Sequence, residues 1–313
     1  MLTRIYKNIK QHPVLLLLAI VWFSLLIISE QWRLTFEYGG FLFLGILGAI
    51  FANSTGAGGG VVFVPFFNQF SISSDSIIAT SFAIQCCGMT AGALSWFRHY
   101  RSLNGKSFLG IINQDVADKS QASEWCILIP ALTIVTPFSI LGIWFAQFLL
   151  QNFTSQIQSG LSFYFGLFSI VLAIAIYASI PFMNRQANRT TMTLIDKINL
   201  PCIGFFGGIV TAWLSVGVGE LVAVYLILRG FNISFAIALA VILSAFSVHA
   251  GIYYHLFVSH DIYWQILIFA GAGAIMGGLI AKHIVLWFSP VRLKLFFGTW
   301  VLIMGVAGLP FFD

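Results

Sequence analysis

The chain has 313 residues, of which 59% are hydrophobic and only 8% are charged, and its formal net charge is +5. A soluble domain carries roughly a quarter charged residues, so this composition excludes a water-soluble globular protein. Several apolar runs reach about 18 residues, the length that crosses the hydrocarbon core, and none alternates as a membrane β-strand does. We therefore expect an all-α, multi-pass membrane protein whose partners include the lipid bilayer.

The positive charges are confined to a few loops, which indicates a role in orienting the chain in the membrane. A nucleic-acid partner is therefore not expected. The sequence contains neither a CxxC pair nor histidines at ligand spacing, so no metal site and no cofactor are expected.

The N-terminal segment, residues 1–35, places Arg4, Lys7 and Lys10 before an apolar run at 14–28. A small-residue cleavage site does not follow this run, so we expect a retained transmembrane helix rather than a cleaved signal peptide. The basic residues predict a cytoplasmic N-terminus.

Seven segments are expected to span the membrane, roughly residues 13–29, 77–97, 125–150, 160–182, 234–257, 262–286 and 294–312. Two further stretches, 36–70 and 201–229, consist of an apolar piece, a glycine-rich break and a second apolar piece of about ten residues. That second piece reaches only ~15 Å, half a bilayer. The loops rich in Lys and Arg share one side if each broken stretch returns to the side it came from, which predicts two helical hairpins and an external C-terminus.

The two halves of the chain align when one is shifted by 159 positions, the separation of Gly45 and Gly204. The same shift pairs Gly48 with Gly207, Gly58 with Gly217 and Gly60 with Gly219. Together with the hairpins, this alignment predicts two repeats of inverted topology, an arrangement typical of secondary transporters. The expected organisation is a first repeat at 36–182, a cytoplasmic linker at 183–200 and a second repeat at 201–313.

The hairpin tips, residues 53–60 and 212–219, are expected to meet near the midplane of the membrane. Irregular backbone survives at that depth where it lines a cavity or is packed in protein. Each glycine run precedes a short helix, whose free N–H groups and positive dipole end attract an anion. Close helix packing is the alternative role for such glycines. The candidate substrate-binding residues are Asn53, Ser54, Thr55, Gly58, Gly59, Gly60, Thr80, Ser81, Gln85, Trp213, Ser215, Gly217, Gly219 and Ser244.

Two ionisable residues at membrane depth, Glu220 and His249, are candidates for carrying a coupling proton. Binding of a substrate ammonium and capping of the following helix are alternative roles for Glu220, and a hydrogen-bonded packing role is the alternative for His249. The spacing places Ser81 with Gln85, and Ser244 with His249, on roughly one helix face each. Those faces are expected to line the cavity opposite the tips.

The segments GAGGGVVFVP at 56–65 and SVGVGELVAVY at 215–225 resemble the sulfite exporter TauE/SafE family, over nearly all of the chain after its first helix. The resemblance implies a carrier in the bacterial inner membrane for sulfur-containing anions, such as sulfite or an organosulfonate like sulfoacetate. The second half departs from the glycine-rich pattern, because Val218 and Glu220 stand at the positions that match Gly59 and Val61.

The resulting functional hypothesis is a secondary transporter that moves a small sulfur-containing anion by alternating access. An enzyme is not expected, since the chain lacks GxSxG, HExxH and CxxC motifs, and an ATP-binding motif is also absent. An anion channel and a carrier of a different small organic anion remain as alternatives. The small anionic substrate is the expected partner, and assembly as a homodimer is left open.

Overall fold

The computed structural model describes residues 32–70, 72–108, 125–180, 189, 191–288, 290–307 and 309. The chain divides into two compact units, Met1–Gly40 and Phe41–Asp313. In the first unit the described helix is α3 (Trp32–Tyr38). The span expected at 13–29 lies outside the described residues.

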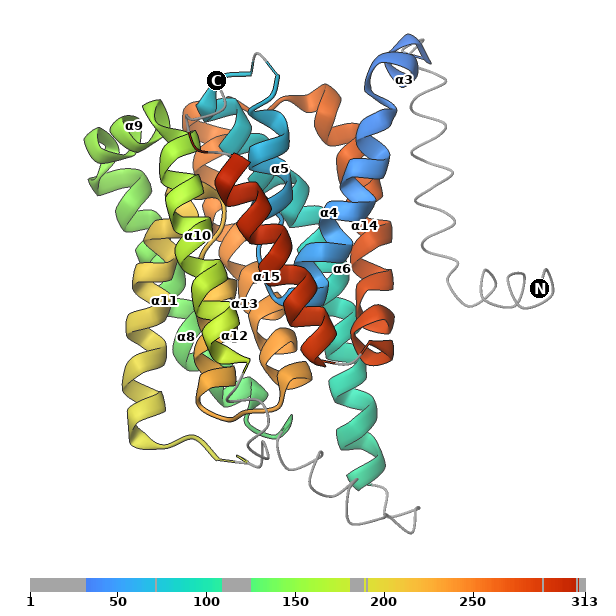
Figure 1. Cartoon of the computed structure of the whole chain (residues 1–313), viewed down its shortest axis with the longest axis vertical. Coiled ribbons are helices and arrows are strands. Elements are labelled where there is room, and N and C mark those ends of the chain that lie inside the picture. Colours follow the sequence, from blue (N-terminus) through green and yellow to red (C-terminus); the bar gives the residue numbers. More distant parts are fainter. Residues whose placement is uncertain are drawn as a thin grey trace, which may run out of the picture. The chain divides into compact units, whose positions relative to one another are not determined.

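The second unit is a bundle of helices, and within the described residues the protein has helices and no strands (Figure 1). The all-α prediction is therefore confirmed. The elements are α4 (Gly40–Thr55), α5 (Gly60–Phe67), α6 (Ser74–Phe108), α8 (Leu128–Trp144), η1 (Phe145–Leu149), α9 (Gln151–Ser159), α10 (Leu161–Ser179), α11 (Leu194–Leu214), α12 (Val218–Leu228), α13 (Ile233–Tyr254), η3 (His255–Ser259), α14 (Trp264–Trp287) and α15 (Pro290–Ala307).

Six of the described helices are long and apolar enough to cross a membrane. They are Ser74–Ser102, Leu128–Leu149, Leu161–Ala178, Leu194–Leu214, Ile233–Ser259 and Trp264–Trp287. Five of them coincide with expected spans. The last expected span falls on α15, whose apolar part Gly298–Ala307 is shorter than a full span.

The sixth helix, α11, differs from the prediction, because it begins at Leu194 inside the expected linker rather than at residue 201. Thr193 and Asp196 form a reciprocal capping box at its start, which satisfies backbone N–H groups that would otherwise lack partners. The Asp196 carboxylate also accepts a hydrogen bond from Arg229 Nε at 2.7 Å. These contacts extend the helix by nearly two turns beyond the apolar stretch seen in the sequence.

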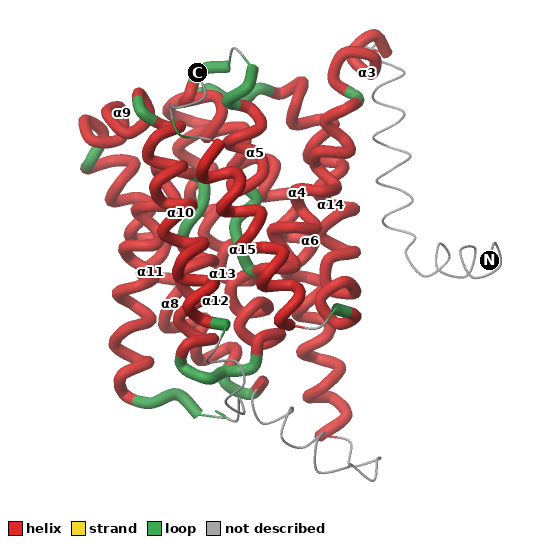
Figure 2. The backbone as a smooth tube through the Cα atoms, viewed as in Figure 1, coloured by secondary structure: helices red, strands yellow, loops and turns green. Residues whose placement is uncertain are grey.

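Two hairpins interrupt the bundle, α4 with α5 and α11 with α12. Their breaks lie at residues 56–59 and 215–217, and Figure 2 shows them as green segments inside the bundle, away from its ends. At the base of the first hairpin, the rings of Phe41 and Phe70 lie 5.9 Å apart. The base of the second is the Asp196–Arg229 pair, and the two bases lie at opposite ends of the bundle (Figure 1). The glycine-broken hairpins expected from the sequence are present.

Glycines allow the hairpins to pack closely against full-length helices. A methyl group at Gly142 of α8 would clash with the Phe205 carbonyl oxygen of α11. A methyl group at Gly277 of α14 would clash in the same way with the Ile46 carbonyl oxygen of α4. The backbones therefore touch at these points, as small residues permit in membrane helices.

Candidate functional site

The first tip begins where α4 ends. The Thr55 hydroxyl donates to the Phe51 carbonyl at 2.8 Å and accepts the Ala57 N–H at 3.2 Å, which closes the last turn. Gly56 follows with a φ of 80°, a left-handed conformation that glycine adopts without the cost of a Cβ. The chain then runs through Gly58 into α5.

The second tip has the same kind of break. Ser215 has a φ of 59°, and its N–H donates to the Thr211 carbonyl at 2.8 Å. The Thr211 hydroxyl accepts the N–H of Val218 at 2.9 Å and so satisfies the first turn of α12. Gly56 and Ser215 are separated by the same 159 positions that align the two halves of the sequence.

The two tips touch through their backbones. A methyl group at Gly60 would clash with the Ser215 carbonyl oxygen, and one at Gly219 would clash with the Gly56 carbonyl oxygen. The shift of 159 positions converts one contact into the other. Glycine is therefore required at Gly60 and Gly219 by close approach of the opposite tip.

Glu220 joins the two tips from the first turn of α12. Its side chain is only 1% exposed. One carboxylate oxygen accepts the N–H of Gly58 at 2.6 Å, and the other accepts the N–H of Gly217 at 2.8 Å. Two amides expected to be available to a ligand are thus occupied by a carboxylate of the protein itself.

The space between the tips is small. The cavity lined by Gly58, Glu220 and their neighbours has a volume of about 10 Å³, close to the roughly 10–15 Å³ that one water requires. The expectation that the tip amides face an open cavity is therefore wrong for this conformation. The carboxyl oxygens of Glu220 take the place that an anion would have at these amides, and the tips close around them.

Polar residues of α6 hold the second tip in place. Gln85 Nε2 donates to the Ser215 carbonyl at 3.0 Å and to the Ser215 hydroxyl at 2.8 Å. The Ser215 hydroxyl in turn donates to Ser81 Oγ at 2.9 Å. The predicted common face of Ser81 and Gln85 is therefore present, and it faces the tips.

Ser244 lines the tip cavity from near the middle of the span Ile233–Ser259. Its hydroxyl is buried and has no hydrogen-bond partner within the described part of the chain. The prediction that His249 shares this face is wrong, because His249 is exposed on α13 and its Nδ1 lies 2.7 Å from the Ala245 carbonyl oxygen. Five residues turn a helix by about 500°, which leaves the two side chains roughly 140° apart.

Other candidate residues make contacts away from the tip cavity. Asn53 Nδ2 donates to the carbonyls of Ala49 at 2.8 Å and Gly88 at 3.3 Å, which ties α4 to α6. The remaining contacts are Ser54 Oγ to the Ala281 carbonyl at 3.4 Å, the Tyr263 N–H to Thr80 Oγ1 at 2.9 Å, and Trp213 Nε1 to Thr154 Oγ1 at 3.1 Å. In this conformation these side chains fasten the hairpins and their neighbours.

The sequence interpretation missed some residues of the cavity. The structure adds Thr211, Val216, Val218 and Val248 to its lining. Thr211 had a usable signal, because it is a hydroxyl at membrane depth one helical turn before the second tip. The three valines carry no signal that separates them from other apolar residues.

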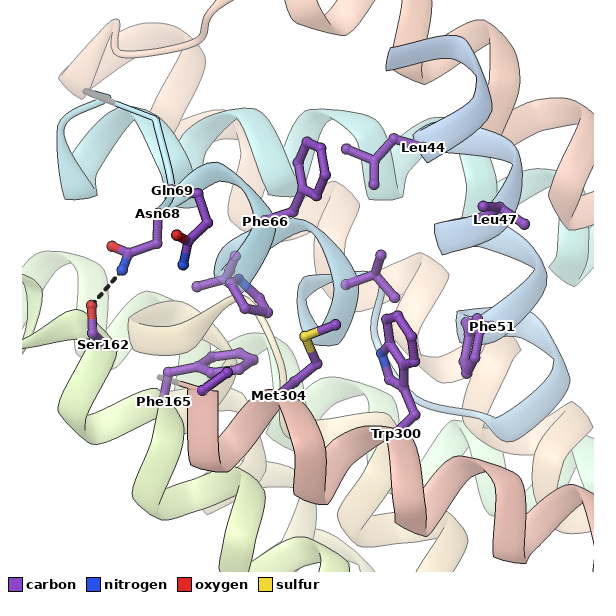
Figure 3. Close-up of a pocket in the computed structure, with 14 residues that line it drawn as sticks. Leu44, Leu47, Phe51, Phe66, Asn68, Gln69, Ser162, Phe165, Trp300 and Met304 are labelled. Carbon is purple, nitrogen blue, oxygen red and sulfur yellow. Dashed lines mark hydrogen bonds between the residues drawn. The ribbon is translucent and has the colours of Figure 1, made fainter. Parts of the chain in front are cut away.

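A separate cavity of about 410 Å³ lies beside the first hairpin, between α4, α5, α10 and α15. Figure 3 shows Phe51, Phe165, Trp300 and Met304 around it, and the hydrogen bond from Asn68 Nδ2 to Ser162 Oγ, 2.7 Å long, at one side. Most of its lining is apolar, so it has few groups that could replace the hydrogen bonds between a small oxyanion and water. The tips are the better candidate site.

One of the comparisons with known proteins identifies a family. The family model for the sulfite exporter TauE/SafE matches residues 117–308, so the chain belongs to this family of membrane transporters. The match includes the second hairpin, whereas the first lies before it. None of the curated proteins and none of the solved structures compared with the chain matches it.

Proposed function

We propose that the protein is a secondary carrier for a small sulfur-containing anion, sulfite or an organosulfonate such as sulfoacetate, in the bacterial inner membrane. Membership of the TauE/SafE family and the six apolar helices support membrane transport. The N-terminus would lie in the cytoplasm and the C-terminus outside, as the distribution of basic loops indicates.

The position of the Glu220 carboxylate is the observation that carries this proposal. Its two oxygens accept one N–H from each tip, at 2.6 and 2.8 Å. A sulfonate or sulfite group also presents several acceptor oxygens on one atom. When Glu220 withdraws, the same amides become available to such a group, with Gln85, Ser215 and Ser244 beside them.

Glu220 also gives a route to proton coupling. An ionised Glu220 and a bound anion would repel one another in a site of low dielectric constant. Protonation of Glu220 removes that repulsion and weakens its hold on the tip amides. Glu220 is the ionisable residue that lines this cavity within the described part of the chain, so one proton would accompany one anion.

Alternating access would follow from inverted repeats that rock about the tips. Support comes from contacts that recur in the two halves. Gly60 with Ser215 becomes Gly219 with Gly56 under the shift of 159 positions. Gly142 with Phe205 corresponds to Gly277 with Ile46, where the two glycines are 135 positions apart because the first half carries 24 more residues before Gly142. Tips in contact, with about 10 Å³ between them, favour a carrier over a channel held open through the centre.

Counterflow in proteoliposomes tests this function. Vesicles loaded with unlabelled sulfoacetate should accumulate labelled sulfoacetate transiently and saturably. Thermal stabilisation of the purified protein by sulfite, thiosulfate, sulfoacetate, sulfate and simple carboxylates then ranks the substrates. A response to carboxylates alone would assign a different organic anion, and flux at ion-conduction rates without saturation would assign a channel.

A further inference from the structure

A second polar cavity, here called the vestibule, lies at the end of the bundle where α6 begins. Its volume is about 190 Å³. It is lined by residues of η1, α9 and η3, by the start of α6, by the ends of α11 and α13, and by Asp261. Ala212 of α11 borders it, next to Thr211 of the tip cavity. The vestibule therefore reaches the second tip at Ala212 but shares no lining residue with the tip cavity.

Two side chains in the vestibule are buried with a polar atom unused. Gln147 is 3% exposed, and its Nε2 donates to the Gly251 carbonyl at 3.0 Å. Its Oε1 has no partner within the described residues. The same holds for Nε2 of His255, which is 4% exposed. A buried polar atom that is left unpaired is destabilising, so these atoms indicate space for a hydrogen-bonding solute.

The charge of the vestibule is negative. Asp75 and Asp261 both line it and repel one another electrostatically. Its lining contains no Lys or Arg, and the ion pairs found among the described residues involve neither aspartate. An acidic residue in the first turn of a helix interacts favourably with the helix dipole, which accounts for the presence of Asp75 at the start of α6. This interaction does not explain Asp261 or the unpaired amide oxygen of Gln147.

The volume of the vestibule favours an organic solute over a bare ion as its ligand. One water requires roughly 10–15 Å³ of comparable space, so about 190 Å³ holds a molecule of several heavy atoms. The amides and hydroxyls of the lining can hydrogen-bond the rest of such a molecule. The acceptors suit a group that donates several hydrogen bonds and carries a positive charge, which describes a protonated primary amine.

We propose that the vestibule binds the ammonium group of a small organic solute, with Asp75 and Asp261 as counter-charges and Gln147 Oε1 as a buried acceptor. The solute is either a simple alkylammonium or the cationic end of a zwitterion. This site is independent of anion binding at the tips, so each proposal can fail without the other.

Binding to the purified full-length protein tests the proposal with three matched probes. Ethylammonium carries the ammonium alone, ethanesulfonate carries the anion alone, and 2-aminoethanesulfonate carries both. Calorimetric titration should show saturable binding of the two amines. Equal affinities for ethylammonium and 2-aminoethanesulfonate would show that the ammonium group alone determines binding. Tighter binding of 2-aminoethanesulfonate would show that the site prefers a zwitterion. Both results support the proposed site.

The double substitution Asp75→Asn with Asp261→Asn should weaken binding of both amines by about ten-fold or more. It should leave the affinity for ethanesulfonate unchanged. Glu37→Gln, which removes an exposed carboxylate of α3, is the matched control and should change nothing. If the double substitution impairs folding, Gln147→Met removes the buried acceptor and should weaken the amines alone.

Three results would overturn the proposal. The first is an absence of saturable ethylammonium and 2-aminoethanesulfonate binding. The second is an unchanged affinity for both amines in the double variant. The third is saturable binding of sodium from sodium chloride with the same affinity as ethylammonium, which would assign the vestibule to an inorganic cation.

Discussion

The two hairpins differ most at their bases, because the second is held there by an ion pair with hydrogen bonds and the first by a cluster of aromatic rings. At the base of the second, Asp196 is fully buried and bonds Arg229 at 2.7 Å and the Tyr225 hydroxyl at 2.7 Å. The hydrogen bond with Asp196 raises the pKa of the Arg229 guanidinium, which therefore stays charged. At the tip, Gln85 holds Ser215.

The described residues at the base of the first hairpin include no such ion pair. Its base is a cluster of Phe41, Phe66, Phe67 and Phe70, and one side of it borders the cavity of about 410 Å³. Rings slide past one another at lower cost than a buried ion pair can be broken. We therefore expect the first hairpin to be the element that moves, and the second to be the fixed wall against which it closes.

The contact between the tips should be the most sensitive part of both hairpins. Gly60→Ala and Gly219→Ala each place a methyl group against a carbonyl oxygen of the other tip. Overpacking of about 1–3 kcal/mol would lower transport by about ten-fold or more. Counterflow rates measure this, with Gly40→Ala as the control because a methyl group there would meet nothing within 4 Å. Normal rates in both tip variants would show that the tips separate too widely to be tested in this way.

The clamp of the second hairpin should dominate its stability. Arg229→Met removes the cation that contacts the buried Asp196 carboxylate at 2.7 Å and leaves the more distant Arg189, 3.7 Å away. Breaking a buried ion pair costs up to about 3–5 kcal/mol. Thermal unfolding in detergent should show a large fall in Tm. Adding Asp196→Asn to this variant should recover much of the loss, since the poorly compensated buried charge is then gone. A double variant that is less stable than Arg229→Met would contradict the role of the clamp.

The aromatic base of the first hairpin should tolerate change better. Phe67 is fully buried, and Phe67→Leu keeps an apolar side chain of similar bulk, so the expected cost is about 1 kcal/mol. Phe66→Leu is the control, because Phe66 is 41% exposed. A Tm loss for Phe67→Leu as large as that for Arg229→Met would remove the contrast between the two bases.

The apolar cavity beside the first hairpin should give the smallest effect. Ala307→Leu adds apolar volume at its edge and should stabilise the protein by about 0.5–1 kcal/mol. The same substitution should slow transport slightly, because the hairpin has less room to move. Faster transport in a more stable Ala307→Leu protein would argue against movement of the first hairpin into this space.

The sequence predicted the parts of this structure that recur in both halves. Glycines at Gly58, Gly60, Gly217 and Gly219 predicted the two breaks, and the distribution of Lys and Arg predicted that each broken stretch is a hairpin. These features can be predicted because glycine favours breaks in a helix, and basic residues indicate the side of the membrane on which a loop lies. The early start of α11 was missed because the prediction followed apolar stretches, although Thr193 and Asp196 form a local capping box there. The added bond from Arg229 to Asp196 depends on the folded structure.

The side-chain partners at the tips were not predictable from spacing. Asn53, Ser54 and Thr55 stood beside the first break, yet they bond α4, α6 and α14 rather than the tip cavity. Glu220 was singled out as a buried acid, but its bond to Gly58, across 162 positions in the chain, required the folded structure. Short-range patterns locate a site, and tertiary contacts decide which groups fill it.

The central claim is that Glu220 and the transported anion compete for the same tip amides. The most direct test is titration of a simple alkanesulfonate, which stays ionised over the accessible pH range, against the wild type and Glu220→Gln at several pH values. The account predicts that binding to the wild type weakens as pH rises, and that Glu220→Gln binds more tightly at high pH with little pH dependence. Equal affinity in the two proteins, with the same pH dependence, would contradict it.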